Sequence, residues 1–154
     1  MGFAGSEGKM IRVAVAGGFD YFHEGHLDHL LKAKALGDEL IVITHHDELL
    51  IRKKGYCLIP LKGRVDILKQ FRCVDEVVFS IDDDGTVAKT LECIKPDIFA
   101  KGGDRTPDNM PANEIEVCER LGIEIRYGIG DLLSSSRKRM ENAFDAIRAK
   151  RKVG

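Results

Sequence analysis

Apolar residues along the chain form short continuous runs that alternate with segments in which they recur every three or four positions. A short apolar run is typical of a strand buried on both faces of a parallel sheet, whereas the longer period is typical of a helix. The runs predict strands at residues 11–16, 40–43, 76–79, 97–100 and 123–127. The periodic segments predict helices at residues 27–35, 47–54, 61–71, 87–94 and 113–121, and a last helix that opens at residues 134–136. We therefore expect an α/β protein with a five-stranded parallel sheet.

Two of the predicted helices carry more local expectations. Asn113 is expected to cap its helix and Gly122 to end it. In the last helix Met140, Phe144 and Ile147 recur on one face, and we expect that face to turn inward.

Length and composition narrow the class of protein. A chain of 154 residues can bury one adequate core, so we expect one domain over residues 10–154, preceded by a flexible leader or expression remnant at residues 1–9. The sequence has no run of about 18 apolar residues, which predicts a soluble cytoplasmic protein. A net charge of -1 argues against nucleic acid as a partner. Widely spaced cysteines without a C-x-x-C pair argue against a zinc site or a disulfide framework.

The segment between the first predicted strand and the first helix is the richest in candidate chemistry. Gly17 and Gly18 follow the strand directly, and His23 and His26 stand three residues apart at the helix entrance. Glycines let the backbone approach a phosphate without a side-chain clash. Backbone N–H groups in a first helical turn lack intrahelical partners and the helix dipole favours negative charge. The turn therefore predicts a phosphate site in which the imidazoles are additional donors, while Phe19 is expected to pack.

The pattern Gly17-x-Phe19-Asp20-x-x-His23-x-Gly25-His26 resembles the signature of the cytidylyltransferase-type nucleotidyltransferases, and the likeness extends from about residue 10 to residue 139. The resemblance implies a Rossmann-like three-layer fold and transfer of a nucleotidyl group onto a phosphate. It implies that His23 and His26 are catalytic, contacting the triphosphate as its α-phosphorus is attacked. The rest of the motif is implied to bind the nucleotide through Gly17, Gly18, Phe19, Asp20 and Gly25, with Asp20 orienting the loop.

Two basic residues further along the chain fit the same resemblance as catalytic groups that meet phosphate oxygens. Lys54 lies in a basic loop, and Arg64 opens the helix that follows Pro60. Arg64 stands three residues after Leu61 and four before Leu68, at the edge of the apolar stripe, so we expect it to point into a cleft. The alternatives are a solvated loop lysine and a snorkelling surface arginine.

The segment Lys101-Gly102-Gly103-Asp104-Arg105 follows the fourth predicted strand and is similar to the Lys-Gly-Gly-Asp stretch of the heptose 1-phosphate adenylyltransferases. The similarity implies that Gly103 and Asp104 lie near the nucleotide and that Arg105 is a phosphate partner. A turn without function is the alternative reading.

Ser134, Ser135 and Ser136 line up with the family's Ser-Thr-Thr at the entrance to the last helix. Hydroxyls and N–H groups there suit nucleotide binding, to a triphosphate or a Mg²⁺-bound phosphate. Simple N-capping by Ser136 is the alternative, and both roles are compatible.

The remaining histidines include His29, His45 and His46. A zinc reading does not fit, because the zincin pattern H-E-x-x-H is H-E-G-H in this chain. We expect no metal ligands in the protein, with the cofactor Mg²⁺ carried by the nucleotide phosphates. His29, three residues after His26, is expected on the helix surface rather than in the cleft.

Together these features predict an ATP-using, Mg²⁺-dependent adenylyltransferase that joins a nucleoside monophosphate to a sugar phosphate, with heptose 1-phosphate favoured, and releases pyrophosphate. The cytidylyltransferases carry an arginine five positions before their serine, where this chain has Ile129, which weakens a CTP reading. The alternatives are a CTP enzyme acting on glycerol 3-phosphate or a similar alcohol phosphate, an FMN adenylyltransferase that makes FAD, and a non-catalytic nucleotide-binding module. The resemblance also implies a homodimer, and neither nucleic acid nor a membrane is expected as a partner.

Overall fold

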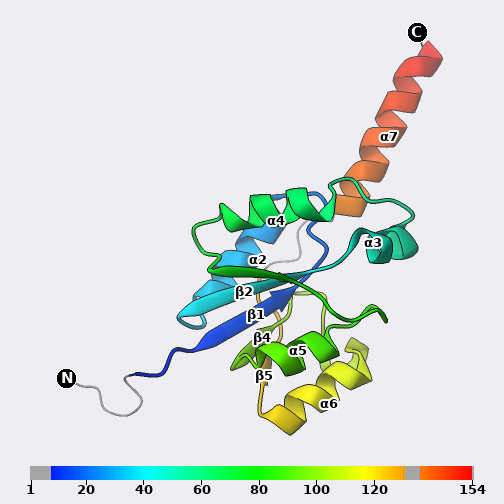
Figure 1. The fold of residues 1–154 in the computed structure, drawn as a ribbon. Coiled ribbons are helices and arrows are strands. Elements are labelled where there is room, and N and C mark those ends of the chain that lie inside the picture. Colours follow the sequence, from blue (N-terminus) through cyan, green and yellow to red (C-terminus); the bar gives the residue numbers. More distant parts are fainter. Residues whose placement is uncertain (1–7, 131–135, 154) are drawn as a thin grey trace.

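The computed structural model describes residues 8–130 and 136–153, which form a parallel sheet with helices on both faces (Figure 1). The sheet has five strands in the order β3-β2-β1-β4-β5. The strands are β1 (Arg12–Ala16), β2 (Glu39–Thr44), β3 (Glu76–Phe79), β4 (Ile98–Ala100) and β5 (Glu124–Arg126). This architecture confirms the predicted Rossmann-like three-layer α/β fold with a five-stranded parallel sheet.

Helices follow the strands in the predicted alternation. They are α2 (Glu24–Lys34), α3 (Asp47–Lys54), α4 (Leu61–Lys69), α5 (Ala88–Ile94), α6 (Ala112–Leu121) and α7 (Ser136–Val153), with a 3-10 turn at Pro107–Asn109. Figure 1 shows α2 and α4 over one face of the sheet and α5 and α6 over the other. Among the described residues, no helix combines the length and the hydropathy that a membrane span requires.

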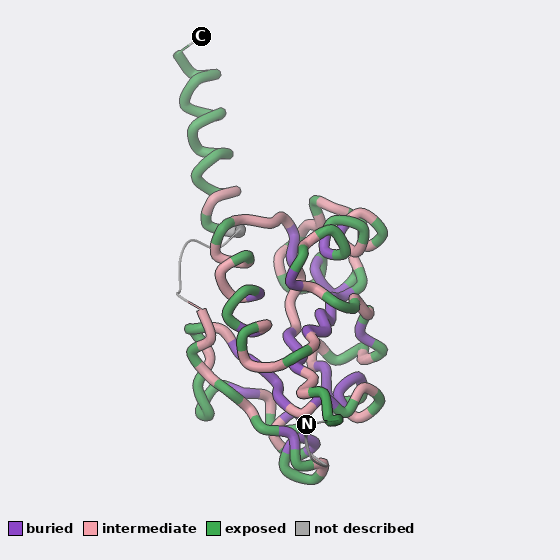
Figure 2. The backbone as a smooth tube through the Cα atoms, turned by 90° about the vertical axis from the view of Figure 1, so that its left-hand side faces the viewer, coloured by how far each residue is buried: buried purple, intermediate pink, exposed green. Residues whose placement is uncertain are grey.

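The alternation of side chains along β1 divides the core between the two faces. Val13 and Val15 pack with Leu30 and Leu68, from α2 and α4. Ala14, between them, packs with residues of α5 and α6 on the opposite face. In Figure 2 the buried residues run through the centre of the domain, with exposed residues on its periphery. A strand covered on both sides needs apolar residues at every position, which is why the sequence shows runs rather than alternation.

Strand order reverses beside β1, because β2 and β3 extend the sheet to one side and β4 and β5 to the other. Register pairs Ala16 with Ile43, and Ala14 with Phe99, so the carboxyl ends of β1, β2 and β4 lie along one edge. In open α/β sheets ligands bind at this edge, where the order reverses. The fold therefore points to the loops that leave β1 and β4.

Helix α6 begins differently from the prediction. Pro111, rather than Asn113, is its N-cap residue, and the helix starts at Ala112. The Asn113 side-chain amide instead donates to Asp84 at 3.2 Å and to Thr86 at 3.0 Å. A tertiary contact to the β3–α5 loop has replaced the local cap. Gly122 ends α6 as predicted, in the left-handed region at φ 72°.

The prediction that the face of α7 carrying Phe144 and Ile147 turns inward is wrong. The two side chains are 55% and 59% exposed, and Met140 is only partly buried. Helix α7 leaves the domain and projects outward (Figures 1 and 2). Its base is held by Arg139, whose guanidinium donates to both carboxylate oxygens of Glu24, at 2.6 and 2.8 Å. Periodicity correctly predicted an amphipathic helix. It did not predict that Phe144 and Ile147, on the apolar face of this helix, stay exposed.

Candidate active site

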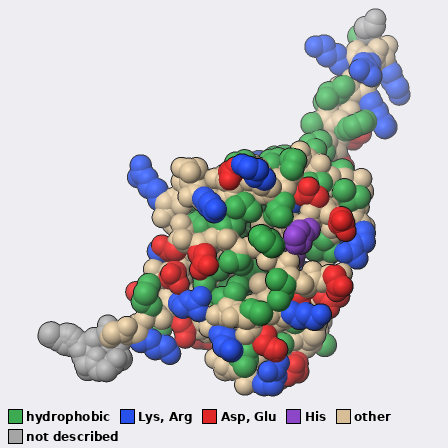
Figure 3. All heavy atoms as spheres, viewed as in Figure 1, with side chains coloured by type: hydrophobic (Ala, Val, Ile, Leu, Met, Phe, Trp, Pro, Cys, Tyr) green, Lys and Arg blue, Asp and Glu red, His purple; other side chains and the backbone are tan. Residues whose placement is uncertain are grey.

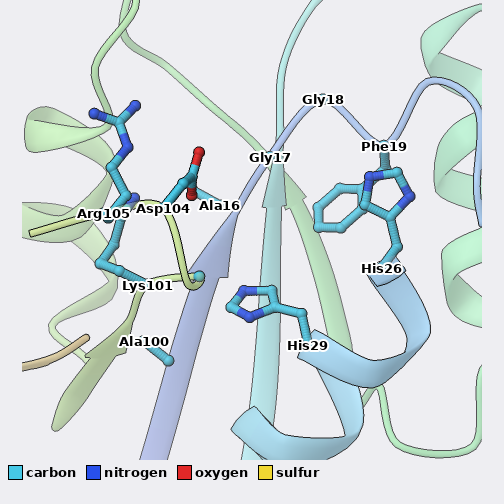
Figure 4. A pocket seen from close by; sticks show the side chains of 11 residues that line it. Ala16, Gly17, Gly18, Phe19, His26, His29, Ala100, Lys101, Asp104 and Arg105 are labelled. Atoms are coloured by element: carbon cyan, nitrogen blue, oxygen red, sulfur yellow. The ribbon is translucent and has the colours of Figure 1, made fainter. Parts of the chain in front are cut away.

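Two hollows adjoin at the carboxyl edge of the sheet. The β4 hollow, of about 250 Å³, lies between α2 and the loop after β4 and is lined by residues that include His26, His29 and Asp104 (Figure 4). The α3 hollow, of about 200 Å³, lies toward α3 and α6 and is lined by residues that include Lys54 and Glu114. The two hollows share part of their walls, formed by Ala16, Gly17, Gly18, Lys101 and Arg105. Two ligands bound in these hollows would therefore meet over the end of β1.

The glycines at the end of β1 lie close to neighbouring side chains. A Cβ on Gly18 would lie 2.8 Å from Leu50 Cδ2, and a Cβ on Gly17 would lie 3.0 Å from Phe19 Cε2. The Gly17 N–H donates to the Ile43 carbonyl, which ties the turn to β2. Both glycines line both hollows, as predicted for a nucleotide-binding turn, and bare backbone remains at the point where the hollows meet.

His23 and His26 form a reciprocal cap at the start of α2. The Gly25 N–H donates to His23 Nδ1 at 3.0 Å, and the His23 N–H donates to His26 Nδ1 at 3.3 Å. The rings stack with centroids 4.0 Å apart. Because Nδ1 of each neutral ring accepts a backbone N–H, its hydrogen must lie on Nε2. His23 Nε2 is a buried donor with no hydrogen-bond partner among the described residues. Phosphate oxygens, which only accept, suit this arrangement.

The electrostatics of the pair keep both rings neutral. Burial lowers the pKa of His26 to about 3, with the nearby His23 adding to the effect. Burial also lowers the pKa of His23, and the positive charge of Arg139 lowers it further. At neutral pH the two imidazoles therefore act as hydrogen-bond donors without a fixed positive charge. A bound polyanion would raise both pKa values by stabilising the protonated rings.

Phe19 lines the β4 hollow, and Asp20 and Gly25, which do not line it, make hydrogen bonds around the turn. Phe19 is buried and packs edge-on against the His26 ring with centroids 5.2 Å apart, which confirms that it packs. Asp20 is 1% exposed, and its carboxylate accepts the backbone N–H groups of Leu58 and Ile59 at 2.7 and 2.6 Å. It therefore orients the loop before α4, and its implied role in orienting its own loop stays a prediction. The backbone N–H of Gly25, a residue implied to bind the nucleotide, donates to His23 Nδ1.

Arg64 does not point into a cleft. Its side chain is fully buried, and its guanidinium donates to the Ile59 carbonyl, the Gly18 carbonyl and Thr44 Oγ1, at 2.8, 3.1 and 2.9 Å. It also donates to Asp47 Oδ1 at 2.6 Å. Position 64, at the edge of the apolar stripe of its helix, therefore faces the interior. Four acceptors there compensate the cost of burying the guanidinium charge. In this conformation Arg64 fixes the Gly18 carbonyl and reaches neither hollow.

The loop after β4 contributes to both hollows. Asp104 and Arg105 line the β4 hollow, whereas Gly103 is exposed and is not among its lining residues, and the implied nucleotide contacts of all three stay predictions. Arg105 also donates to the Asn109 carbonyl at 2.8 Å, which closes the loop. Lys101 was quoted within the motif but not selected, yet it lies in the shared wall, 9% exposed, with its amine over the Phe99 ring. Burial lowers the pKa of Lys101. Its place directly after a buried strand was the signal that could have singled it out.

His29 corrects a second expectation. It lines the β4 hollow instead of lying on the helix surface, and Figure 4 shows its ring pointing from α2 into the hollow. His29 Nδ1 lies 2.5 Å from the Ile129 carbonyl oxygen, in the chain segment after β5. Burial lowers the pKa of His29. No pattern in the sequence indicates this contact, because it joins residues 100 positions apart.

The α3 hollow combines cations with one buried carboxylate. Lys54 lines it as expected, together with Lys53 and His45. Glu114, which no sequence signal marked, is 4% exposed and accepts the Val87 N–H through Oε2 at 3.0 Å. Its Oε1 has no hydrogen-bond partner among the described residues. Of the serine cluster, Ser134 and Ser135 lie outside the described residues, and Ser136 is the first residue of α7.

Comparison with known proteins decides the family. A family model described as "Cytidylyltransferase-like" matches residues 14–141. The chain belongs to the cytidylyltransferase-like family. This confirms the resemblance drawn from the His-x-Gly-His motif and the prediction of a nucleotidyltransferase. A crystal structure of a lipopolysaccharide core biosynthesis protein from Thermoplasma volcanium is 30% identical, covers 82% of this chain and all of that one, and superposes with a TM-score of 0.65.

Curated relatives correct the predicted acceptor. The FAD synthase of Pyrococcus abyssi is 43% identical over 119 residues, 76% of this chain and 79% of that protein. The FAD synthase of Pyrococcus horikoshii is 46% identical over 106 residues, 68% and 70% of the two chains. The bifunctional protein HldE of Hahella chejuensis is 38% identical over 112 residues, only 23% of its length. The expectation of a heptose 1-phosphate acceptor is therefore wrong, because the FAD synthases match at 43% and 46% identity over most of both chains, whereas HldE matches at 38% over less than a quarter of its length.

Proposed function

We propose that this protein is an FMN adenylyltransferase, which transfers AMP from ATP to FMN and so forms FAD and pyrophosphate. The observation that carries the proposal is the identity of 43% and 46% to FAD synthases over most of both chains. The two hollows support it, since they offer adjoining places for a nucleotide and a phosphorylated acceptor. ATP is assigned to the β4 hollow and the FMN phosphate to the α3 hollow.

The reaction needs alignment of two anions more than covalent help. An oxygen of the FMN phosphate attacks the α-phosphorus of ATP, a new P–O bond forms, and the bond to the β-phosphate bridging oxygen breaks as pyrophosphate leaves. The attacking phosphate is already ionised, so no general base is required. Lys53, Lys54 and Lys101 reduce the repulsion between the two substrates. The Nε2–H groups of His23 and His26 donate to the oxygens on which negative charge accumulates.

We further propose that Mg²⁺ takes part, bound to the nucleotide's phosphates. Among the described residues no group of three or more His, Cys, Asp or Glu side chains is placed to hold a metal ion, and lysines line the α3 hollow. Phosphate oxygens of the nucleotide are ligands that Mg²⁺ prefers, so the ion can arrive with the nucleotide. When bound, the ion would neutralise charge on the departing pyrophosphate.

A homodimer is also proposed. The exposed apolar residues Phe144 and Ile147 on α7, with Leu27 and Leu31 on α2, at 43% and 52% exposed, are surfaces that a second copy would cover. Figure 3 shows hydrophobic and basic side chains together on the projecting α7. Sedimentation of the full chain beside a double variant, Phe144→Ser with Ile147→Ser, tests the contribution of α7. A wild-type monomer at micromolar concentration would refute the dimer.

The activity is tested by incubating the purified protein with ATP, Mg²⁺ and FMN and measuring FAD and pyrophosphate. The matched arms replace ATP by CTP, and FMN by glycerol 3-phosphate. The proposal expects FAD only with ATP and FMN. Activity restricted to CTP and glycerol 3-phosphate would replace it with a cytidylyltransferase, and tight nucleotide binding without turnover on any acceptor would indicate a non-catalytic module.

A further inference from the structure

The three histidines of α2 are held in two opposite hydrogen-bonding states. His23 and His26 each accept a backbone N–H at Nδ1, so their hydrogen lies on Nε2. His29 lies 2.5 Å from a carbonyl oxygen through Nδ1, and a carbonyl oxygen can only accept. The neutral His29 ring therefore carries its hydrogen on Nδ1 and presents a lone pair at Nε2. Along one helix the chain offers two donors followed by an acceptor.

This order matches the order of groups in a nucleoside triphosphate. The phosphates have only acceptor oxygens and suit the donors of His23 and His26. His29 lies three residues further along α2, roughly 4.5 Å at 1.5 Å per residue. The ribose, whose hydroxyls are donors, is attached directly to the α-phosphate, whereas the base is one group more distant. Across the hollow Asp104 provides a second acceptor (Figure 4).

We propose that His29 recognises the ribose of the bound nucleotide, with its Nε2 accepting a hydrogen bond from one of the two ribose hydroxyls. This inference rests on the proposed function for the presence of ATP in the β4 hollow. The Ile129 carbonyl is the positioning group, because its bond to Nδ1 fixes both the orientation and the tautomer of the ring. Burial keeps the ring neutral and so preserves the lone pair.

Two substitutions separate the two nitrogens of the ring. In His29→Asn the side-chain amide keeps a donor near the Nδ1 position, where it can bond the Ile129 carbonyl, but nothing replaces Nε2. In His29→Gln the longer side chain brings an amide oxygen to the region of Nε2. His46→Asn is the matched control, because His46 is exposed at the N-cap of α3 and lines neither hollow.

The experiment measures dissociation constants by calorimetry in the absence of FMN, so that no turnover occurs. The ligands are ATP, 2′-deoxy-ATP, 3′-deoxy-ATP and purine riboside triphosphate. Loss of a neutral hydrogen bond is expected to weaken ATP binding about threefold to tenfold in His29→Asn, and much less in His29→Gln or His46→Asn. The wild type should bind one of the two deoxynucleotides about threefold to tenfold more weakly than ATP. For that deoxynucleotide, His29→Asn should have the same dissociation constant as the wild type. Melting temperatures within a few degrees of the wild type show that the variants fold.

Several outcomes overturn the inference. If the loss of affinity from His29→Asn adds fully to the loss from removing either ribose hydroxyl, His29 contacts neither hydroxyl. Non-additivity only with purine riboside triphosphate, which lacks the amino group of adenine, would move the contact to the base. The binding results are independent of FAD synthesis. If the protein binds the deoxynucleotides more weakly than ATP as expected but forms no FAD, the proposed acceptor is wrong and the ribose contact stands. If the protein forms FAD but His29→Asn binds ATP as tightly as the wild type, the ribose contact is wrong and the proposed acceptor stands. If a variant fails to fold, the wild-type comparison of the two deoxynucleotides still decides, since equal binding of all three nucleotides refutes a ribose contact.

Discussion

Replacing Arg64 with lysine tests whether this residue supports the site from the interior or contacts phosphate directly. The guanidinium donates to four acceptors, and three of them, the carbonyls of Gly18 and Ile59 and the hydroxyl of Thr44, are neutral groups at least partly shielded from water. A lysine amine on a flexible stem cannot reach all of them. The ion pair with Asp47 adds less, because the Asp47 side chain is 40% exposed.

The expected loss follows from these contacts. Leaving two shielded acceptors without donors costs roughly 2–4 kcal/mol of the free energy of unfolding. For a chain of this size that corresponds to a fall in melting temperature of roughly 5–15 °C. Because Arg64 holds the Gly18 carbonyl, the KM for ATP should also rise. Urea denaturation and initial-rate kinetics measure the two effects.

Arg72→Lys is the control, since Arg72 is exposed and the same substitution there should change the free energy of unfolding by less than about 0.5 kcal/mol. A stable Arg64→Lys protein with a large loss of turnover would refute the interior role. It would instead support a direct phosphate contact, reached in a conformation different from the one described.

Three further changes have defined outcomes. His26→Ala should slow turnover by roughly 10² to 10³ with little change in melting temperature, and nearly unchanged turnover would remove His26 from catalysis. Asp20→Asn replaces an acceptor of two N–H groups by a side chain that accepts only one, so the denaturation midpoint should correspond to a loss of roughly 1–3 kcal/mol; an unchanged midpoint would contradict that role. Burial lowers the pKa of His45 to about 4, from 6.5. The unfolded chain therefore binds a proton that the folded chain excludes between those values, so stability is full above pH 6.5 and falls toward pH 4. His45→Gln should flatten that fall in a series of thermal melts, by up to roughly 3 kcal/mol, and an unaltered pH profile would refute the assignment.

Local pattern was sufficient for the fold and for placing the centre of the candidate site at the end of β1. Runs of apolar residues marked β1, β2 and β4 because these strands are buried on both faces of the sheet, and shorter runs were enough to mark β3 and β5, which are more exposed. The His-x-Gly-His segment could be placed at a helix entrance because a strand signal preceded it and helical periodicity followed. The carboxyl edge of a parallel sheet then brought Gly17, Gly18, Lys54 and Arg105 together without any knowledge of their contacts.

The tertiary structure decided what each polar group faces. Arg64 and His29 lie on helices that periodicity predicted correctly, yet the side chain of Arg64 is buried in the interior and that of His29 lines the β4 hollow. Their acceptors, the Gly18 and Ile129 carbonyls, are 46 and 100 positions away along the chain. Hydrophobic burial leaves its period in the sequence because it is set by the local geometry of strand and helix. A single hydrogen bond between distant segments leaves no periodic pattern in the sequence. The tautomer of His29 and the burial of Arg64 therefore follow only from the tertiary structure.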